Sequence, residues 1–579
     1  MAANRLENLL NWAKKHDVQI PEGLRYYSDE LMGLSCVAEK DILSAQFSIP
    51  SSIIITGELA RKHFGAKTSL NTWLKFLLAK MKFGEEAIIV DGEDIKEKFA
   101  PYLDCLPDSI DTPIVWNPSE LQLLKSTNLG SSLRDKLYLI FKEWKHVALA
   151  LDICNELISD EISICDHFME LSDEEVYEKI TSQVFGNDQF PWFSFRAFLW
   201  AHLIFLSRAF PEYVLNPSTD TSKIMLLPVI DLLNHNYNAK VEWLRLDDSF
   251  CVRCLMPLSK GQEVLNNYGG KGNEELLTGY GFVMENNVFD TVALRIKLPT
   301  DTIANILQNE DIVLPTLTDY TRFAFEDGKE THKSSKDVTD FEDGVLYLIS
   351  KENDISLSQL LDLFAFVEKN SNESRTSLRA QLQGLQKLRL ALEYKLDTIS
   401  VGPETSSNSY PIKPYRKFCA DVYRKSQRHI LKHNINSLKR IEKEWTSTHK
   451  SRLVTVKKIL KADSTFFEED VPNLFGGNLD VTFTSYNHIL MLWIIWRSKN
   501  STCSQLPRRY NWVFEAFKLF NDQYHSDILI TPETRDLYKS LFPNGSEKIC
   551  IDEVAIASSF ISSNSYTRIS NDESILVQT

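Results

Sequence analysis

The chain has 579 residues, which is too long for a single hydrophobic core, so two or three domains are expected. Apolar residues make up 43% and charged residues 25%, a composition typical of soluble globular proteins. The formal net charge of −15 argues against free nucleic acid as the main partner and fits a basic protein substrate, although an acidic balance is also common among cytosolic proteins.

The cysteine pattern argues against a disulfide scaffold and against a zinc site. Nine cysteines are scattered through the chain, an odd number at low density. Cys251 and Cys254 form a close pair, but neither a second pair nor two histidines follow at the spacing that zinc requires. We therefore expect ordinary thiols, no bound metal and a reducing compartment. This predicts a cytoplasmic protein and leaves entry into the nucleus open.

The N-terminal segment MAANRLENLLNWAKKHDVQIPEG has leucines at helical spacing but lacks the long apolar core of a signal peptide. The longest apolar run, ILMLWIIW at 489–496, has eight residues and is too short to cross a bilayer. We therefore expect neither an export signal nor contact with a membrane.

The first half of the chain predicts a β-rich domain that is interrupted by helices. Short strand-like segments occupy residues 20–60, and similar segments return between 224 and 295. Between them, residues 62–210 have helical patterns such as LNTWLKFLLAKMKFG. The sequence therefore predicts the α+β fold class, with a β-rich domain at 20–295 and a helical insertion at about 62–210.

Residues after about 300 have mostly helical patterns. Leucines recur there in steps of three and four residues and form an amphipathic stripe: Leu378, Leu382, Leu385, Leu388, Leu392 and Leu396. SVGPETSSNSYP at 400–411 is typical of a linker or a long loop. We predict an all-helical domain at 300–560, followed by a mobile tail at 562–579.

A basic block follows the linker. Residues 411–463 contain 15 Lys and Arg against 4 Asp and Glu, in a chain that is acidic as a whole. Such a block is most often the solvated face of a helix. The alternative is a patch that contacts ribosomal RNA or an acidic surface.

An apolar run leads directly into polar residues within 207–238, SRAFPEYVLNPSTDTSKIMLLPVIDLLNHNYN. Asp231, Asn234 and His235 follow the run, and Arg208 stands near the start of the segment. By itself this pattern is typical of a core strand that ends in a turn, where Asn and Asp bond to the local backbone. The alternative is a strand that delivers polar groups to a ligand.

Two further segments carry glycines beside polar or aromatic residues. In DELMGLSCVAEKDI (29–42), Gly33 opens a strand, and KGQEVLNNYGGKGNEELLTGYGF (260–282) has Tyr-Gly pairs that begin at Tyr268 and Tyr280. A lone Tyr-Gly pair indicates a half-buried aromatic before a turn, and GGKGNE lacks the spacing of a phosphate-binding loop. The combination of all three segments is more specific than any one of them.

Together these segments resemble the SET-domain protein methyltransferases of the RuBisCO large-subunit methyltransferase type. DLLNH and NNYGGKGNEELLTGYGF are the strongest matches. KFAPYLDCLPDSIDTPIVWNPSELQLLKSTNLG (98–130) is similar to that family's PYxxxLP segment and to the Trp and Glu-Leu after it. SFRAFLWAHLIFLSRAF (194–210) is similar to its Trp-Ala helix, which ends in Ser-Arg. The helical stretch after 300 fits its C-terminal substrate-binding domain.

The resemblance implies S-adenosylmethionine as the cofactor. Transfer of its methyl group to an amine is an in-line displacement that needs alignment, exclusion of water and a neutral amine, but no metal. The resemblance implies that these residues bind the cofactor: Glu30, Met32, Gly33, Arg208, Asn234, His235 and Tyr268. Arg208 would pair with the cofactor carboxylate through a charge-assisted hydrogen bond.

The resemblance also implies roles close to the reacting methyl group. Tyr268 would be the catalytic tyrosine, whose oxygen contacts the polarised methyl, and Tyr280 would be a second catalytic tyrosine in the same pocket. Phe210 would form an apolar wall of the substrate pocket that disfavours a charged ammonium. Asp231 would belong to the same pocket and orient these residues rather than touch the methyl.

Three positions depart from the pattern of that family. Leu31 stands where its first strand usually has a glycine, so the approach to the cofactor differs there. The tyrosine expected after the Asn-His pair has no clear counterpart, and Tyr237, Val241 and Trp243 compete for its place. The pocket wall and the number of methyl groups therefore stay open. Glu212 replaces an arginine of the plant enzyme, which indicates a different substrate environment.

These observations predict a protein-lysine N-methyltransferase that acts on the translation machinery, as the fungal branch of that family does. A ribosomal protein is the first choice of substrate, and elongation factor 1-alpha is the alternative. Two other interpretations are a histidine N-methyltransferase and a degenerate SET scaffold that only binds a partner. We expect a monomer, and the sequence does not name the target residue or its methylation state.

Overall fold

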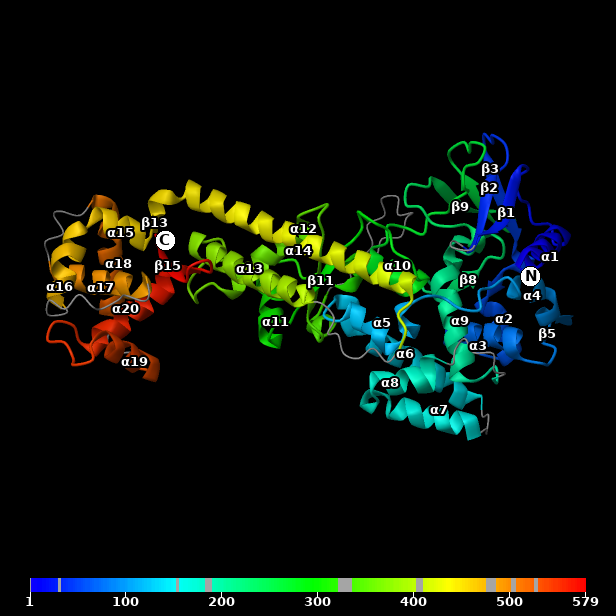
Figure 1. Cartoon of the computed structure of the whole chain (residues 1–579), viewed down its shortest axis with the longest axis horizontal. Helices are drawn as coiled ribbons and strands as arrows, with labels where there is room; N and C mark the ends of the chain where they lie inside the picture. The colour runs from blue at the N-terminus through cyan, green and yellow to red at the C-terminus, as the bar shows by residue number, and fades with distance from the viewer. Residues whose placement is uncertain are drawn as a thin grey trace. The chain divides into compact units, whose positions relative to one another are not determined.

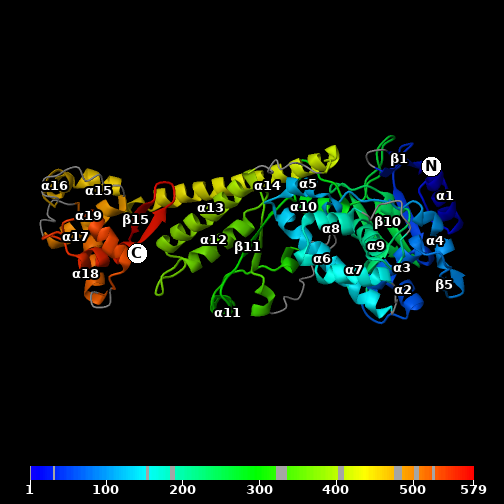
Figure 2. The ribbon, with the colours of Figure 1, turned by 60° about the horizontal axis from the view of Figure 1, so that its bottom comes forward.

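The computed structural model describes residues 2–29, 33–151, 156–182, 190–320, 336–401, 410–474, 486–500, 507–524 and 529–578. The chain divides into two compact units (Figure 1 and Figure 2). The first unit contains the described residues up to Asp290 and those of Val401–Gln427, and the second contains the others. The division after Asp290 lies close to the predicted end of the β-rich domain at 295. The return of Val401–Gln427 to the first unit is not predicted by the sequence.

Small antiparallel sheets provide the β structure of the first unit. Its strands are β1 (Leu24–Asp29), β2 (Gly33–Ala38), β3 (Ala45–Pro50), β4 (Ile55–Thr56), β5 (Ile89–Val90), β6 (Glu93–Asp94), β7 (Ala209–Pro211), β8 (Ile224–Leu226), β9 (Val241–Leu246) and β10 (Ser249–Cys254). β10 lies between β3 and β9, and β8 lies between β4 and β7. Most of these strands lie in the segments that the sequence predicts as β, so the α+β class is confirmed.

Helices fill the predicted insertion between β4 and β7. The helices of this unit are α1 (Ala2–Lys15), α2 (Gly57–Phe64), α3 (Leu70–Phe83), α4 (Ile95–Leu103), α5 (Pro118–Leu121), α6 (Asn128–Ala150), α7 (Glu156–Asp166), α8 (Asp173–Val176), α9 (Phe195–Arg208) and α10 (Asn273–Tyr280). Large side chains such as Trp144, Phe198 and Trp200 are almost fully buried between these helices. Burial of this apolar surface holds the insertion against the sheets.

A buried ion pair joins the start of helix α14 (Pro414–Thr448) to the insertion. Asn117 and Glu120 form a capping box at the start of α5, and the Glu120 side chain is fully buried. Arg416 Nη1 donates to Glu120 Oε2 at 2.6 Å, and its Nη2 lies 2.6 Å from Asp111 Oδ1. The Glu-Leu of the WNPSEL segment is therefore a docking point for α14, a role that the sequence did not predict.

The second unit is mainly helical but carries small sheets, so the prediction of an all-helical domain is wrong in this detail. Its helices are α11 (Thr300–Asn309), α12 (Ile355–Val367), α13 (Leu378–Ser400), the rest of α14, α15 (Val456–Ala462), α16 (Val471–Leu474), α17 (Tyr486–Lys499), α18 (Asn511–Tyr524), α19 (Pro532–Leu541) and α20 (Ile551–Asn564). Its strands are β11 (Val292–Ile296), β12 (Val345–Ile349), β13 (Leu453–Val454), β14 (Ser565–Arg568) and β15 (Glu573–Val577). In β12 buried residues alternate with partly buried ones, which is the pattern of a strand packed on one face.

Among the described residues, three apolar clusters form the core of the second unit. The predicted leucine stripe lies on α13, where Leu385, Leu388 and Leu392 are buried against β12, α12 and α14. Leu378 and Leu382 of the same stripe are buried against β13, β14 and β15. The longest apolar run of the sequence forms α17, and Trp493 is fully buried there with residues of α18 and α20. The run is thus a core helix, and no helix in the described ranges is long and apolar enough to span a membrane.

The prediction of a mobile tail at 562–579 is wrong. β14 and β15 form an antiparallel hairpin, and β15 also pairs with β13. Ile575, Leu576 and Val577 are at most 1% exposed. The short apolar run SILV is too brief to stand out in the sequence, but it is buried because it pairs on both edges.

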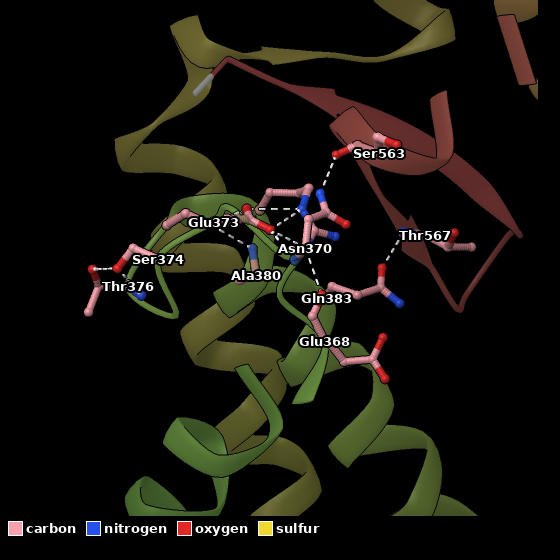
Figure 3. Close-up of polar contacts among 11 residues, drawn as sticks. Glu368, Asn370, Glu373, Ser374, Thr376, Ala380, Gln383, Ser563 and Thr567 are labelled. Atoms are coloured by element: carbon pink, nitrogen blue, oxygen red, sulfur yellow. Dashed lines mark hydrogen bonds and ion pairs between the residues drawn. The ribbon is translucent and has the colours of Figure 1, made fainter. Parts of the chain in front are cut away.

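Polar contacts tie α13 to this hairpin, and the connection between α12 and α13 to α20 (Figure 3). Asn370 Nδ2 donates to the Ser563 carbonyl oxygen at 2.8 Å, and Thr567 N–H donates to Gln383 Oε1 at 3.0 Å. Glu373 accepts a hydrogen bond from Asn370 N–H at 2.9 Å and so fixes this connection. These side-chain bonds satisfy a backbone carbonyl in the last turn of α20, an N–H of β14 and an N–H of the connection.

Candidate functional site

The apolar run of residues 224–230 ends in a strained turn. Strand β8 stops at Leu226, and Val229 has φ 77° although it is a β-branched residue and fully buried. Such a conformation is rare for valine and persists only where the surrounding structure holds it. Tyr26 Oη donates to the Val229 carbonyl oxygen at 3.5 Å. The turn directs Asp231 away from the strand, toward α9.

Asp231 contacts Arg208, which is the last residue of α9. Arg208 Nη1 donates to the Asp231 carbonyl oxygen at 2.7 Å and lies 3.4 Å from Oδ2, while Tyr102 Oη donates to Oδ2 at 2.7 Å. The Asp231 side chain has no exposed surface, and burial raises its pKa while Arg208 and Tyr102 lower it. Full burial fits a residue that orients Arg208 better than one that lines an open pocket. Tyr102 was missed, although it belongs to the quoted PYLDCLP segment.

Asn234 and His235 connect three segments that are far apart in the sequence. Asn234 Nδ2 donates to Ser35 Oγ at 2.9 Å and to Glu263 Oε1 at 2.8 Å. Asn266 N–H donates to the Asn234 carbonyl oxygen at 2.8 Å, and His235 forms a parallel bridge with Asn266. The Asn-His pair is therefore fixed between β2 and the segment that leads to Tyr268.

Three aromatic rings stack at the end of that segment. The ring centroids of His235 and Tyr268 are 4.8 Å apart, and those of Tyr268 and Tyr280 are 4.9 Å apart, with 19° between planes in both pairs. Tyr268 N–H donates to His235 Nδ1 at 3.0 Å, and Tyr268 Oη donates to the Leu233 carbonyl oxygen at 2.8 Å. The structure thus brings both predicted catalytic tyrosines together with the Asn-His pair.

Burial controls the protonation of these rings. It raises the pKa of Tyr268 to about 12 and also raises the pKa of Tyr280, so both hydroxyls are neutral near pH 7. It lowers the pKa of His235 to about 4, with a smaller contribution from Lys271. These three rings are therefore neutral hydrogen-bonding groups near pH 7 and do not act as a charged acid or base.

Gly33 opens β2 with φ 73°, and a Cβ at this position would meet no atom within 4 Å. The open space beside a left-handed glycine lets a ligand approach the backbone closely. Glu30 and Met32, which were predicted to contact the cofactor through backbone groups, lie outside the described residues.

An apolar wall forms around Phe210, on β7 directly after Arg208. Phe210 is 4% exposed, and its ring centroid lies 5.0 Å from that of Trp243 and 5.9 Å from that of Phe250. Trp243 Nε1 donates to Asn266 Oδ1 at 3.0 Å. Of the two aromatic residues among the candidates for the missing tyrosine, Trp243 lies beside Phe210, whereas Tyr237 packs against Phe289.

The site offers hydrogen-bonding and apolar groups but no cluster of metal ligands. Within the ranges that the structure describes, no three His, Cys, Asp or Glu side chains are placed to hold a metal ion. Cys251 and Cys254 are buried free thiols on β10. The arrangement suits a ligand with a carboxylate, which Arg208 can bind, held next to neutral tyrosines.

Sequence comparison finds relatives that match over the whole chain. The chain is 42% identical to Ribosomal lysine N-methyltransferase 1 of Saccharomyces cerevisiae, over 100% of both chains. It is 27% identical to Protein-lysine N-methyltransferase EFM1 of the same yeast, over 94% of this chain and 91% of that protein. A family model described as the EFM1 middle domain matches residues 324–449.

Solved structures with a similar fold include two of Rubisco LSMT. The structure bound to AdoMet has a TM-score of 0.51 at 17% identity, and the match covers 76% of this chain and 93% of that chain. The crystal structure of the SET domain of LSMT bound to lysine and AdoHcy has a TM-score of 0.50 at 16% identity, with 82% and 98% covered. At these identities the likeness establishes the fold alone.

Proposed function

The chain belongs to the SET-domain protein-lysine methyltransferases, and from this premise we propose that it methylates a lysine of a ribosomal protein, with S-adenosylmethionine as the methyl donor. The observation that carries the proposal is 42% identity, over the full length of both chains, to a relative named for ribosomal lysine methylation. Identity to the relative named EFM1 is lower, at 27%. Elongation factor 1-alpha is therefore the second candidate substrate.

The residues around Gly33 and Arg208 fit S-adenosylmethionine, which supplies an electrophilic methyl group on a positively charged sulfur. The Arg208 side chain is 19% exposed, and its contacts with described residues use only Nη1. Its Nε and Nη2 donors therefore remain to bind the carboxylate of the methionine end. Asn234, held through Ser35 and Glu263, keeps its Oδ1 as an acceptor.

We assign the contact with the reacting methyl group to Tyr268. Because its hydroxyl proton is donated to the Leu233 carbonyl, its oxygen retains lone pairs for C–H groups that a neighbouring positive charge polarises. A hydroxyl with a pKa of about 12 does not act as a base near pH 7. The role of Tyr268 is thus electrostatic, and Tyr280 holds its ring by stacking.

Phe210 and Trp243 support lysine rather than histidine as the target. An apolar wall disfavours a charged ammonium, so it promotes loss of the proton from the lysine before transfer. A histidine is already largely neutral near pH 7, so a histidine pocket gains less from such a wall and more from a polar partner.

The test combines purified protein, labelled S-adenosylmethionine and a lysate that contains ribosomes and soluble factors from cells that lack the enzyme, with a Tyr268→Phe control. One labelled ribosomal protein, mapped to a lysine by mass spectrometry and reduced roughly a hundredfold in the control, is expected. Label on a histidine would replace the lysine assignment, and label on elongation factor 1-alpha would replace the substrate. Absence of both labelling and cofactor binding would leave only a scaffold.

We also propose that the exposed part of the basic block contacts ribosomal RNA. Arg416 and Arg424 are committed to carboxylates and carbonyls of the first unit. Arg428, Lys432 and Lys443 on α14 are exposed, and positive side chains at helical spacing suit a phosphate backbone. Reversing these three charges should weaken ribosome binding and reduce its dependence on salt. Unchanged ribosome binding would reject the contact.

A further inference from the structure

Helix α10 ends at one of the stacked tyrosines, and α14 contacts its opposite end. α10 closes at Tyr280, and Gly281 terminates it in the left-handed conformation. Near the start of α10, Tyr423 Oη donates to Glu274 Oε2 at 2.8 Å and accepts a hydrogen bond from Leu129 N–H at 3.3 Å. Tyr423 is fully buried. Both views place α10 beside the end of α14 that belongs to the first unit (Figure 1 and Figure 2).

A second contact lies at the N-terminus of α10. Asp290 accepts hydrogen bonds from Asn273 N–H, from Asn273 Nδ2 at 2.8 Å and from Ser426 Oγ. Asn273 is fully buried, and Asp290 is 4% exposed. The carboxylate thus caps the first turn of α10, where the helix dipole favours a negative charge.

The Asp290 carboxylate depends on these hydrogen bonds. No Lys, Arg or His forms an ion pair with it in the part of the chain that the structure describes. A buried carboxylate without a cation keeps its place only if its hydrogen-bond donors remain. Ser426 supplies one of these donors, and Tyr423 fixes the neighbouring Glu274 from the same face of α14.

We propose that Tyr423 and Ser426 are positioning residues, which hold α10 so that Tyr280 stacks on Tyr268. Among the residues that the structure describes, Tyr423 bonds to Leu129 and Glu274 and Ser426 bonds to Asp290, so both act through the first turn of α10. The inference rests on the proposed function, because it takes its meaning from the roles assigned to Tyr268 and Tyr280. By this inference, the first turns of α14 contribute to the positioning of the catalytic residues.

The test uses full-length Tyr423→Phe and Ser426→Ala, each alone and combined with Tyr280→Ala, which removes the stacked ring. Tyr415→Phe is the control, because Tyr415 lies on the same helix, is 44% exposed and has no hydrogen bond to α10 within the described residues. We measure single-turnover methyl transfer, the Kd of S-adenosylmethionine, the KM of the protein substrate and amide exchange over residues 273–280.

Each of the two variants should lower the transfer rate about tenfold at unchanged Kd and KM, and should raise amide exchange over 273–280. In the Tyr280→Ala background, which lacks the stacked ring, the same substitutions should have no further effect on the rate, because they act through that ring. Losses that multiply with Tyr280→Ala, or rates equal to those of the control, would overturn the inference. Absence of methyl transfer by the wild-type protein would instead overturn the proposed function and the positioning role with it.

Discussion

Replacement of Arg416 by methionine should destabilise the first unit strongly. The Glu120 side chain has no exposed surface. Without the guanidinium, its donors among the described residues are the N–H groups of Asn117 at 3.1 Å and Lys413 at 2.9 Å. Removing one partner of a buried ion pair leaves an uncompensated charge, which costs about 3–5 kcal/mol. Urea unfolding measures the stability of this unit when it is monitored through the release of bound S-adenosylmethionine.

Lys413→Met is the matched control. The Lys413 side chain is 63% exposed and its Nζ lies 4.0 Å from Asp111 Oδ1, so this pair contributes less than about 1 kcal/mol. Glu120→Gln added to Arg416→Met should recover part of the loss, because a neutral amide is cheaper to bury than a carboxylate. Equal destabilisation by Arg416→Met and Lys413→Met, or no recovery by Glu120→Gln, would refute this account of the docking point.

Three further predictions concern the site and the hairpin. The pKa of His235 is lowered from 6.5 to about 4, so between these pH values the unfolded chain binds a proton that the folded site excludes. His235 therefore contributes stability above pH 6.5 that is lost as the pH falls toward 4. In thermal melts at several pH values, the melting temperature of His235→Gln should fall less with decreasing pH than that of the wild type, and an equal fall would contradict this. Gly281→Ala should lower the free energy of unfolding by at least about 1–2 kcal/mol, because φ is 77° and the new Cβ would lie 3.0 Å from the Asp111 carbonyl carbon. Gly545→Ala is the control, because it adds the same backbone strain without a close contact and should cost less in the same melts. Leu576→Ala should lower the free energy of chemical unfolding by about 2–5 kcal/mol, because Leu576 is fully buried. Leu519 is 70% exposed, so Leu519→Ala should be nearly neutral. Equal effects of the two substitutions would instead support the prediction of a mobile tail.

The candidate site was largely predictable because most of its residues stand in short local patterns. The run into Asp231, Asn234 and His235 and the Tyr-Gly pairs at Tyr268 and Tyr280 are local patterns, and the structure brings them together. The resemblance to a family supplied their expected roles, which no spacing alone contains. The roles of these residues remain predictions, as do those of Glu30 and Met32.

The sequence by itself determined the α+β class, the helical insertion and the helical second unit, because hydrophobic periodicity and capping residues act within a few residues of one another. The tertiary structure decided how Tyr102 reaches Asp231, how Arg416 reaches Glu120 and how Tyr423 reaches Glu274. These partners are separated by more than a hundred residues, and each is a common residue type with many other partners available. The packing of the buried helices selects one partner for each of these residues and excludes water from between the partners. No local sequence pattern therefore predicts these contacts.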